Sequence, residues 1–266
     1  MTAGRVVSLS AGTVLDATPE EALAAAAAAG FDAFGTRWDP ERLPRAAIGP
    51  LRRRVDDSGL ALLDLEVVRL GPGVPVPDHR PWADVAAELG ARFLLVVSSH
   101  DDPARAADEL ATLAGWCAPA GVTVALEFMR FTAVPTLRAA GELVRAAGGA
   151  GLTVLVDVLH LQRGGESADD LTAPGAPPVG YLQLCDAPAA PPGDLAALAA
   201  EARHGRLFPG EGELPLADVL AALPADLPVC VEVQSDSWSR QLDVPARARR
   251  ARDSVRDLLG APDPAR

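Results

Sequence analysis

Eight short apolar segments, each followed by a longer helical segment, are the feature that most restricts the folds open to this chain. The apolar segments are rich in Val, Leu and Phe, as parallel strands covered by helices on both faces should be. Several helical segments open at Thr, Ser or Asp and close at Gly, which are common helix boundaries. No linker divides the series. Eight strand–helix units in about 250 residues predict an α/β fold with a single (β/α)8 TIM barrel over residues 1–266.

The strands are expected within eight ranges of the sequence: 6–14, 31–38, 60–70, 91–100, 122–129, 151–161, 179–187 and 228–235. The alternative is a doubly wound open sheet, but no GxGxxG follows the first strand. An extended loop at about 187–212 follows the seventh strand and is too long for a minimal connection. In a barrel it would form a lid or wall beside the site, although an idle surface insertion is the alternative.

Composition excludes several classes of function. A net charge of −12 argues against a nucleic-acid surface. The chain has no lysine, so it cannot form the lysine Schiff base of some aldolases and of pyridoxal-phosphate enzymes. Three distant cysteines do not suggest a disulfide framework, and no apolar run reaches the roughly 18 residues of a membrane span. With no signal-peptide pattern at the N-terminus, we expect a cytoplasmic protein without a membrane partner.

Polar residues interrupt four consecutive apolar segments near their predicted carboxyl ends. The segments ALEF, LVDV, YLQL and CVEV contribute Glu127, Asp157, Gln183 and Glu232. TIM-barrel sites form at the carboxyl ends of the strands, and buried carboxylates there need a counter-charge. These four residues are therefore the predicted metal ligands. Oxygen ligands favour Mn²⁺ or Mg²⁺, with Co²⁺ or Zn²⁺ as alternatives.

Arginines are expected at the same face of the barrel. Arginine forks bind carboxylate or phosphate groups, so we expect a small anionic substrate such as a sugar phosphate or a carboxylated polyol. The alternative is that some of these arginines pair with Glu66, Asp101 or Asp186, and we expect at least one such pair. The predicted substrate-binding residues are Arg37, Arg69, Arg130 and Arg206, with His100 and Trp38 beside them.

The chain resembles the xylose isomerase-like TIM barrels, the sugar phosphate isomerase/epimerase group, most specifically in its second half. The resemblance covers essentially the whole chain and is most specific in ALEFMR, VDVLH, YLQLCDA, GRLFPGEGELPL and VCVEVQSD. It implies the same four metal ligands, Glu127 and Glu232 as the acid–base pair, and substrate contacts from His160 and Arg206. Many epimerases of the group have His where this chain has Gln183. Gln at this position is similar to what is seen in members of the dehydroshikimate dehydratase type.

These residues predict a metal-dependent isomerase or epimerase acting through a metal-stabilised enediolate. A dehydratase or lyase of the dehydroshikimate or inosose dehydratase type is the alternative on the same scaffold. His160 is the third predicted catalytic residue, as a proton shuttle or oxyanion partner, unless it only orients Asp157. An abasic-site nuclease fits poorly with four histidines and net charge −12, and a non-enzymatic binding protein would bind no metal. A homodimer is one possible oligomeric state.

Overall fold

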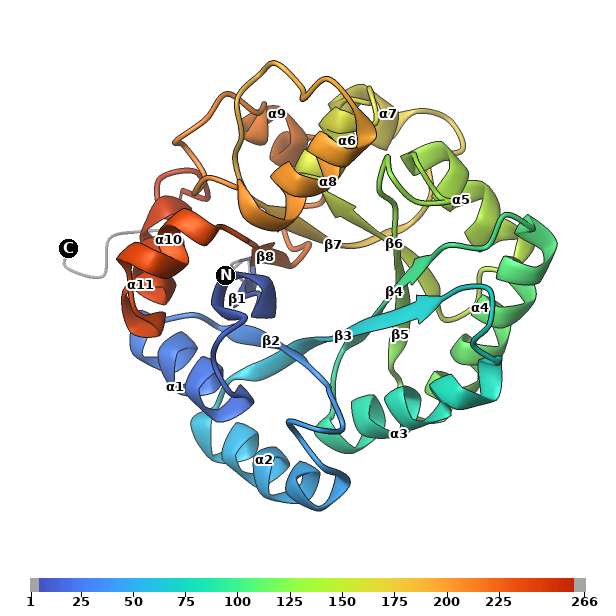
Figure 1. Ribbon diagram of the computed structural model, residues 1–266, viewed down its shortest axis with the longest axis horizontal. Coiled ribbons are helices and arrows are strands. Elements are labelled where there is room, and N and C mark those ends of the chain that lie inside the picture. The colour runs from blue at the N-terminus through green and yellow to red at the C-terminus, as the bar shows by residue number, and fades with distance from the viewer. Residues whose placement is uncertain (1–4, 261–266) are drawn as a thin grey trace.

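A closed barrel of eight parallel strands forms the centre of the computed structural model, which describes residues 5–260. Each strand pairs with its neighbours in chain order and β1 closes the ring against β8 (Figure 1). The predicted TIM barrel is therefore confirmed. The strands are β1 (Val7–Leu9), β2 (Ala33–Arg37), β3 (Ala61–Leu70), β4 (Phe93–Ser98), β5 (Thr123–Glu127), β6 (Leu152–Asp157), β7 (Val179–Leu184) and β8 (Val229–Val231).

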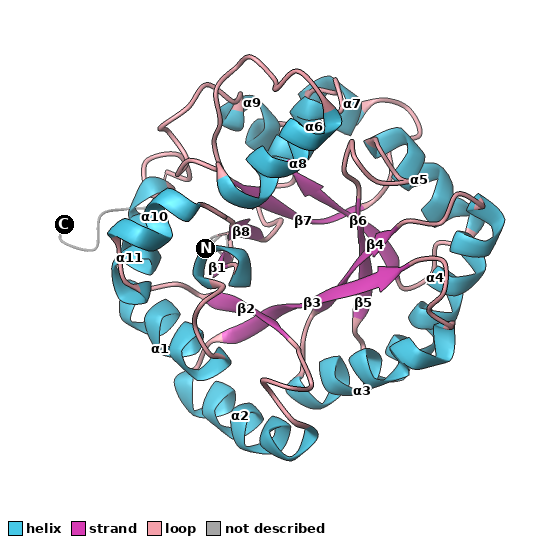
Figure 2. Ribbon diagram, viewed as in Figure 1, coloured by secondary structure: helices cyan, strands magenta, loops and turns pink. Residues whose placement is uncertain are grey.

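Helices surround the strands as an outer ring (Figure 2). No helix within residues 5–260 combines the length and the apolar character needed to cross a membrane. The α-helices are α1 (Pro19–Ala29), α2 (Arg45–Ser58), α3 (Arg80–Leu89), α4 (Pro103–Cys117), α5 (Leu137–Ala146), α6 (Val158–Arg163), α7 (Ala168–Thr172), α8 (Leu195–His204), α9 (Leu216–Ala221), α10 (Asp236–Gln241) and α11 (Val244–Ser254). Three 3-10 turns accompany them: η1 (Ala11–Val14), η2 (Val76–His79) and η3 (Ala118–Ala120).

Local sequence sets the start and end of the first long helix. The Thr18 hydroxyl accepts a hydrogen bond from the Glu21 amide, and the Glu21 carboxylate accepts one from the Thr18 amide. This reciprocal capping box satisfies donors that the first turn would otherwise leave unpaired. The helix ends at Gly30, whose φ of 75° is a left-handed conformation that glycine adopts without steric cost.

The barrel interior is mostly apolar but contains one buried polar pair. The side chains that fill it include Leu63, Phe93 and Leu95, and the Phe93 ring stacks on Tyr181 with centroids 4.8 Å apart. The Tyr181 hydroxyl donates to Asp64 Oδ2 at 2.7 Å. Burial raises the pKa of Asp64 well above its ordinary value, and Glu66 adds to the effect. The tyrosine therefore supplies a donor to a carboxyl group that water does not reach.

Two segments differ from the sequence expectation. The apolar run LVDVLHL does not continue as a strand, because β6 ends at Asp157 and α6 begins at the next residue. Asp157 caps that helix by accepting hydrogen bonds from the amides of Leu159 and His160. The 187–212 stretch, expected as a loop, contains the ten-residue helix α8.

Replacing Tyr181 with Phe should destabilise the fold by about 1–3 kcal/mol, because Asp64 loses its hydrogen-bond donor while staying buried. Urea unfolding monitored by circular dichroism measures this. In an Asp64→Ala background, the same Tyr181→Phe change should cost much less. Equal losses in both backgrounds would show that ring packing, rather than the hydrogen bond, sets the cost.

Candidate metal and substrate site

The barrel register brings the four predicted metal ligands to one end of adjacent strands. Asp157 pairs directly with Gln183 across β6 and β7. Glu232 follows the last residue of β8, and its amide donates to the Leu184 carbonyl on β7. Glu127 is the final residue of β5, next to β6. Four strands thus deliver three carboxylates and one carboxamide to the same edge of the barrel.

Arg206 is the counter-ion of two of these carboxylates. Its Nη1 lies 2.6 Å from Asp157 Oδ2 and 3.1 Å from Glu232 Oε2, and Nε donates to the Ala202 carbonyl. All three charged groups are buried, and breaking a buried ion pair leaves a charge without compensation. Burial alone would raise the pKa of Asp157, but the Arg206 guanidinium and His160 together outweigh it and the pKa is lowered. Asp157 is therefore held as a carboxylate.

Glu127 has no arginine partner among residues 5–260. His160 lies beside it, with 3.8 Å between His160 Nε2 and Glu127 Oε1. Burial raises the pKa of Glu127 well above its ordinary value, and the charges of Glu232 and Asp157 raise it further. Burial lowers the pKa of His160 to about 4, although Asp157 opposes the shift. The site therefore places a carboxyl that is easily protonated beside an imidazole that is neutral at physiological pH.

The donor set fits a divalent cation. One ligand atom each from Glu127, Asp157 and His160 lies within 4.8 Å of the other two. Gln183 is fully buried, yet neither its Oε1 nor its Nε2 has a hydrogen-bond partner within the described part of the chain. A buried carboxamide without partners is costly, and a cation would accept its oxygen as a ligand. The unpartnered Gln183 thus supports a metal at this position.

A cavity of about 380 Å³, called here the central cavity, opens beside this donor set. Three of the predicted catalytic residues, Glu127, His160 and Glu232, line it together with Arg206. Phe131 and Thr132 of the β5–α5 connection also line the cavity, as do Ala202, Arg203 and His204 of α8. The segment after β7 therefore forms one wall of the central cavity.

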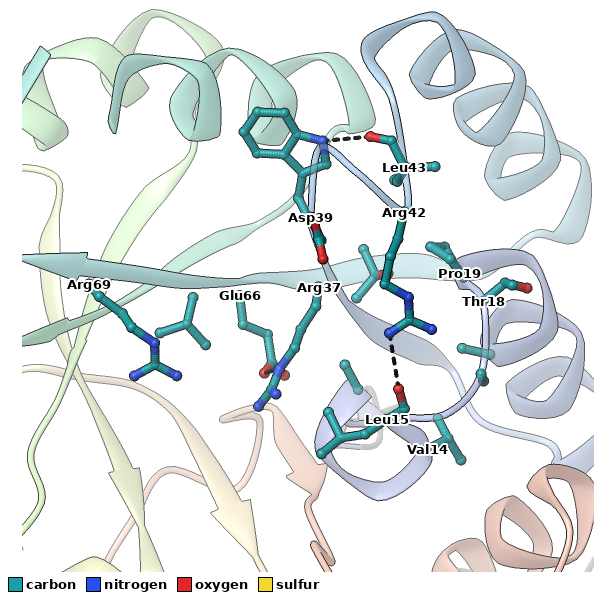
Figure 3. A pocket seen from close by; sticks show the side chains of 16 residues that line it. Val14, Leu15, Thr18, Pro19, Arg37, Asp39, Arg42, Leu43, Glu66 and Arg69 are labelled. Carbon is teal, nitrogen blue, oxygen red and sulfur yellow. Dashed lines mark hydrogen bonds and ion pairs between the residues drawn. The ribbon is translucent and has the colours of Figure 1, made fainter. Parts of the chain in front are cut away.

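A second cavity of about 370 Å³, the side cavity, lies against the central one (Figure 3). Both are lined by Arg37, Glu66 and Arg69, which extend from β2 and β3. Arg37 Nε donates to Glu66 Oε2 at 2.8 Å, and Ser10 Oγ lies within hydrogen-bonding distance of both Glu66 and Glu232. The Arg37–Glu66 ion pair is thus part of the boundary between the two cavities.

Three predicted substrate-binding residues lie away from the central cavity. The Trp38 indole lines the side cavity and donates to the Leu43 carbonyl at 2.9 Å. His100 is buried and lies 2.7 Å from a carboxylate oxygen of Glu109 on α4, and it lines neither cavity. Arg130 is exposed and likewise lines neither. The structure brings Arg37, Arg69 and Arg206 to the central cavity, but not these three.

Glu66 and Arg203 line the central cavity but are not among the predicted site residues. Glu66 was expected only as a possible partner of an arginine at this face, and it is the partner of Arg37. Arg203 lies in the 187–212 stretch, which is rich in Pro and Ala and was expected to be a loop. The signal that could have found it is the run LAALAAEARH after Asp194, since Asp is a common N-cap and the run has good helix formers.

Taken together, the fold and the strand-end carboxylates define a TIM-barrel protein with a candidate metal site at the carboxyl ends of its strands. The family model described as "Xylose isomerase-like TIM barrel" matches residues 23–258. The chain belongs to this family, which confirms the resemblance inferred from the sequence motifs.

Two curated relatives are named 3-dehydroshikimate dehydratase. The protein from Pseudomonas aeruginosa is 32% identical over 265 residues, and the one from Pseudomonas putida is 30% identical over 267 residues. Each match covers 92% of this chain but 40% of the relative. The chain thus spans well under half the length of these relatives.

Solved structures share the fold at low sequence identity. The IOLI protein with a binding zinc atom has a TM-score of 0.81 at 17% identity, covering 96% of this chain and 98% of that one. L-ribulose 3-epimerase has a TM-score of 0.73 at 20% identity, covering 96% and 95%. A fusion protein of a xylose isomerase-like TIM barrel with 4-hydroxyphenylpyruvate dioxygenase scores 0.81 at 24% identity, covering 96% of this chain and 43% of that one.

Adding Mn²⁺ to metal-free protein should give binding of one ion per chain and a rise in melting temperature. At 100 times the dissociation constant, the expected stabilisation is about 2.7 kcal/mol. Glu232→Gln should weaken the binding measured by calorimetry, whereas Glu109→Gln, which alters a buried acid away from both cavities, should not. A protein whose melting temperature ignores divalent cations would contradict the metal site.

The neutral state of His160 predicts a specific pH dependence of stability. The unfolded chain binds a proton on this imidazole near pH 6.5, whereas the folded chain does so only near pH 4. The neutral His160 therefore contributes fully to the free energy of unfolding above about pH 6.5, and this contribution is lost as the pH falls towards about 4. In metal-free protein, His160→Gln should make the loss of unfolding free energy in this window shallower, as measured by urea titrations at several pH values. An unchanged pH profile would contradict a buried neutral imidazole.

Proposed function

We propose that this chain is a divalent-metal-dependent dehydratase that removes water from a cyclic hydroxy-keto acid. The observation that carries the proposal is the strand-end set of Glu127, Asp157, Gln183 and Glu232, in which the buried Gln183 side chain has no partner among residues 5–260. Two relatives of 30–32% identity named 3-dehydroshikimate dehydratase support the reaction type. Because the chain covers 40% of their length, the activity is a proposal for this chain.

Each residue of the site has a role in such a reaction. A divalent cation bound by the four strand-end residues would supply Lewis-acid polarisation of the substrate carbonyl. Glu127 faces the central cavity without an arginine partner in the described chain, so it is placed to take the proton from the carbon beside the carbonyl. Arg206 keeps Asp157 ionised and fixes Asp157 and Glu232 in position. The site thus has one free proton acceptor, Glu127, beside two carboxyl groups that are held in place.

His160 completes the elimination. Its neutral imidazole can donate a hydrogen bond to the hydroxyl group that leaves from the next carbon, while Glu127 passes to that hydroxyl the proton it has taken from carbon. One C–H bond and one C–O bond then break and one water is released. On a ring that already has a ketone and a conjugated double bond, this loss followed by tautomerisation gives an aromatic dihydroxy acid. The 3.8 Å between His160 and Glu127 places both groups on the same small substrate.

An isomerase or epimerase is the second candidate, since the same proton removal followed by reprotonation on the other face inverts the carbon. Its support is structural likeness to D-psicose 3-epimerase (TM-score 0.72) and L-ribulose 3-epimerase, at 15% and 20% identity. Such identities speak for the fold alone. Gln183, which stands where many epimerases of the group have His, favours the dehydratase.

Incubation of Mn²⁺-loaded protein with 3-dehydroshikimate should produce an aromatic acid. The ultraviolet absorbance of this product measures the reaction. Glu127→Gln should reduce kcat by about 100-fold or more because the base is lost, while Glu109→Gln should leave it unchanged. Proton exchange from D₂O into sugar substrates, with epimer formation and no aromatic product, would favour the second candidate. No exchange and no product on either substrate class would contradict both.

A further inference from the structure

Four arginines line the central cavity, and they fall into two groups. Arg37 is paired with Glu66, and Arg206 is paired with Asp157 and Glu232. Arg69 and Arg203 form no ion pair and donate no side-chain hydrogen bond to any residue within 5–260. The cavity thus has two internally neutralised guanidinium groups and two that face solvent or a ligand.

Acidic side chains close to Arg203 have other partners. Glu201, two residues earlier on α8, receives two hydrogen bonds of 2.8 Å from Arg163 on α6. Asp236 lies 3.1 Å from His204. Glu201 and Asp236 are thus already paired with other residues.

An aromatic ring holds the Arg203 guanidinium over the cavity. The guanidinium carbon lies 5.4 Å from the centroid of the Phe131 ring, a cation–π geometry. The Phe131 ring in turn meets His160 edge to face, with centroids 5.7 Å apart. A residue on an exposed helix is thereby placed next to the predicted catalytic imidazole.

The cationic side chains around the cavity repel one another. Burial lowers the pKa of Arg69, Arg37 lowers it further, and Arg203 also acts in this direction, while Glu127 and Glu66 oppose it. In Figure 3 the side chains of Arg37 and Arg69 point to the same side of β3, with Glu66 between them, and all three residues line both cavities. Like charges gathered at one place cost free energy that a bound anion would remove.

We propose that Arg69 and Arg203, which line the same cavity, form a subsite for the carboxylate of the substrate. The proposal rests on the function proposed above and names the two residues that would distinguish a hydroxy-keto acid from a neutral ketose. The two guanidinium forks come from β3 and from α8, and each can offer paired donors to a planar carboxylate. With the carboxylate held there, the reacting part of the molecule lies towards Glu127 and His160 in the same cavity of about 380 Å³.

Binding of a ring acid and its uncharged amide tests the subsite without requiring turnover. Calorimetry on Mn²⁺-loaded protein should show that 3,4-dihydroxybenzoate binds about 10–100-fold more tightly than 3,4-dihydroxybenzamide, as expected for charge-assisted hydrogen bonds. Arg203→Gln and Arg69→Gln should each remove most of this preference. Arg240→Gln, which neutralises an exposed arginine that lines neither cavity, should retain it.

Failure of the subsite can be told apart from failure of the proposed function. If both variants still prefer the acid over the amide, or if the unsubstituted protein shows no such preference, the subsite is overturned even if 3-dehydroshikimate is turned over. A preference lost in both variants would support the subsite even if no hydroxy-keto acid is converted. Competition by inorganic phosphate stronger than by the acid would also overturn the choice of carboxylate. Circular dichroism spectra and melting temperatures of the variants check that they fold.

Discussion

The ion pairs of Arg206 with Asp157 and Glu232 are the interaction on which the arrangement of the site depends. Without the guanidinium, two carboxylates would be buried beside a third with nothing to offset their repulsion. The arginine arrives from the segment after α8, so the chain beyond β7 is needed to stabilise residues on β6 and after β8. A divalent cation would share the two carboxylates with Arg206, because their four oxygens have more lone pairs than the arginine uses.

Much of the barrel could be predicted because parallel strands have a strong sequence signal. Runs such as FLLVVS and LTVLVD are apolar on both faces, and helix signals follow them at regular intervals. The boundary after Asp157 could not be read in the same way, because VLHL is apolar in either conformation and only tertiary context selects the helix. Helix α8 was missed because prolines on both sides made the stretch resemble an irregular loop.

The candidate site shows the same division. The four predicted ligands lie together at the carboxyl ends of their strands, since the barrel fixes where these ends lie, whereas His100 and Arg130 line neither cavity. The sequence indicated that some arginine of this face would pair with Glu66, Asp101 or Asp186, but it could not say which arginine. Neither the partnership of Arg37 with Glu66 nor that of His100 with Glu109 follows from spacing, because each joins residues on different elements. A list of arginines therefore overestimates how many are available to a ligand.

The residues proposed for the reaction and the residue proposed for substrate recognition on α8 belong to different parts of the fold. The strand-end carboxylates belong to the closed sheet, whereas Arg203 belongs to an exposed helix tied to α6 by the Arg163–Glu201 ion pair. Insertions or substitutions in this helix can alter what the cavity accepts without disturbing strand pairing. In evolutionary terms, new substrate preferences can arise in one ten-residue helix, while the inherited donor set on the barrel remains unchanged.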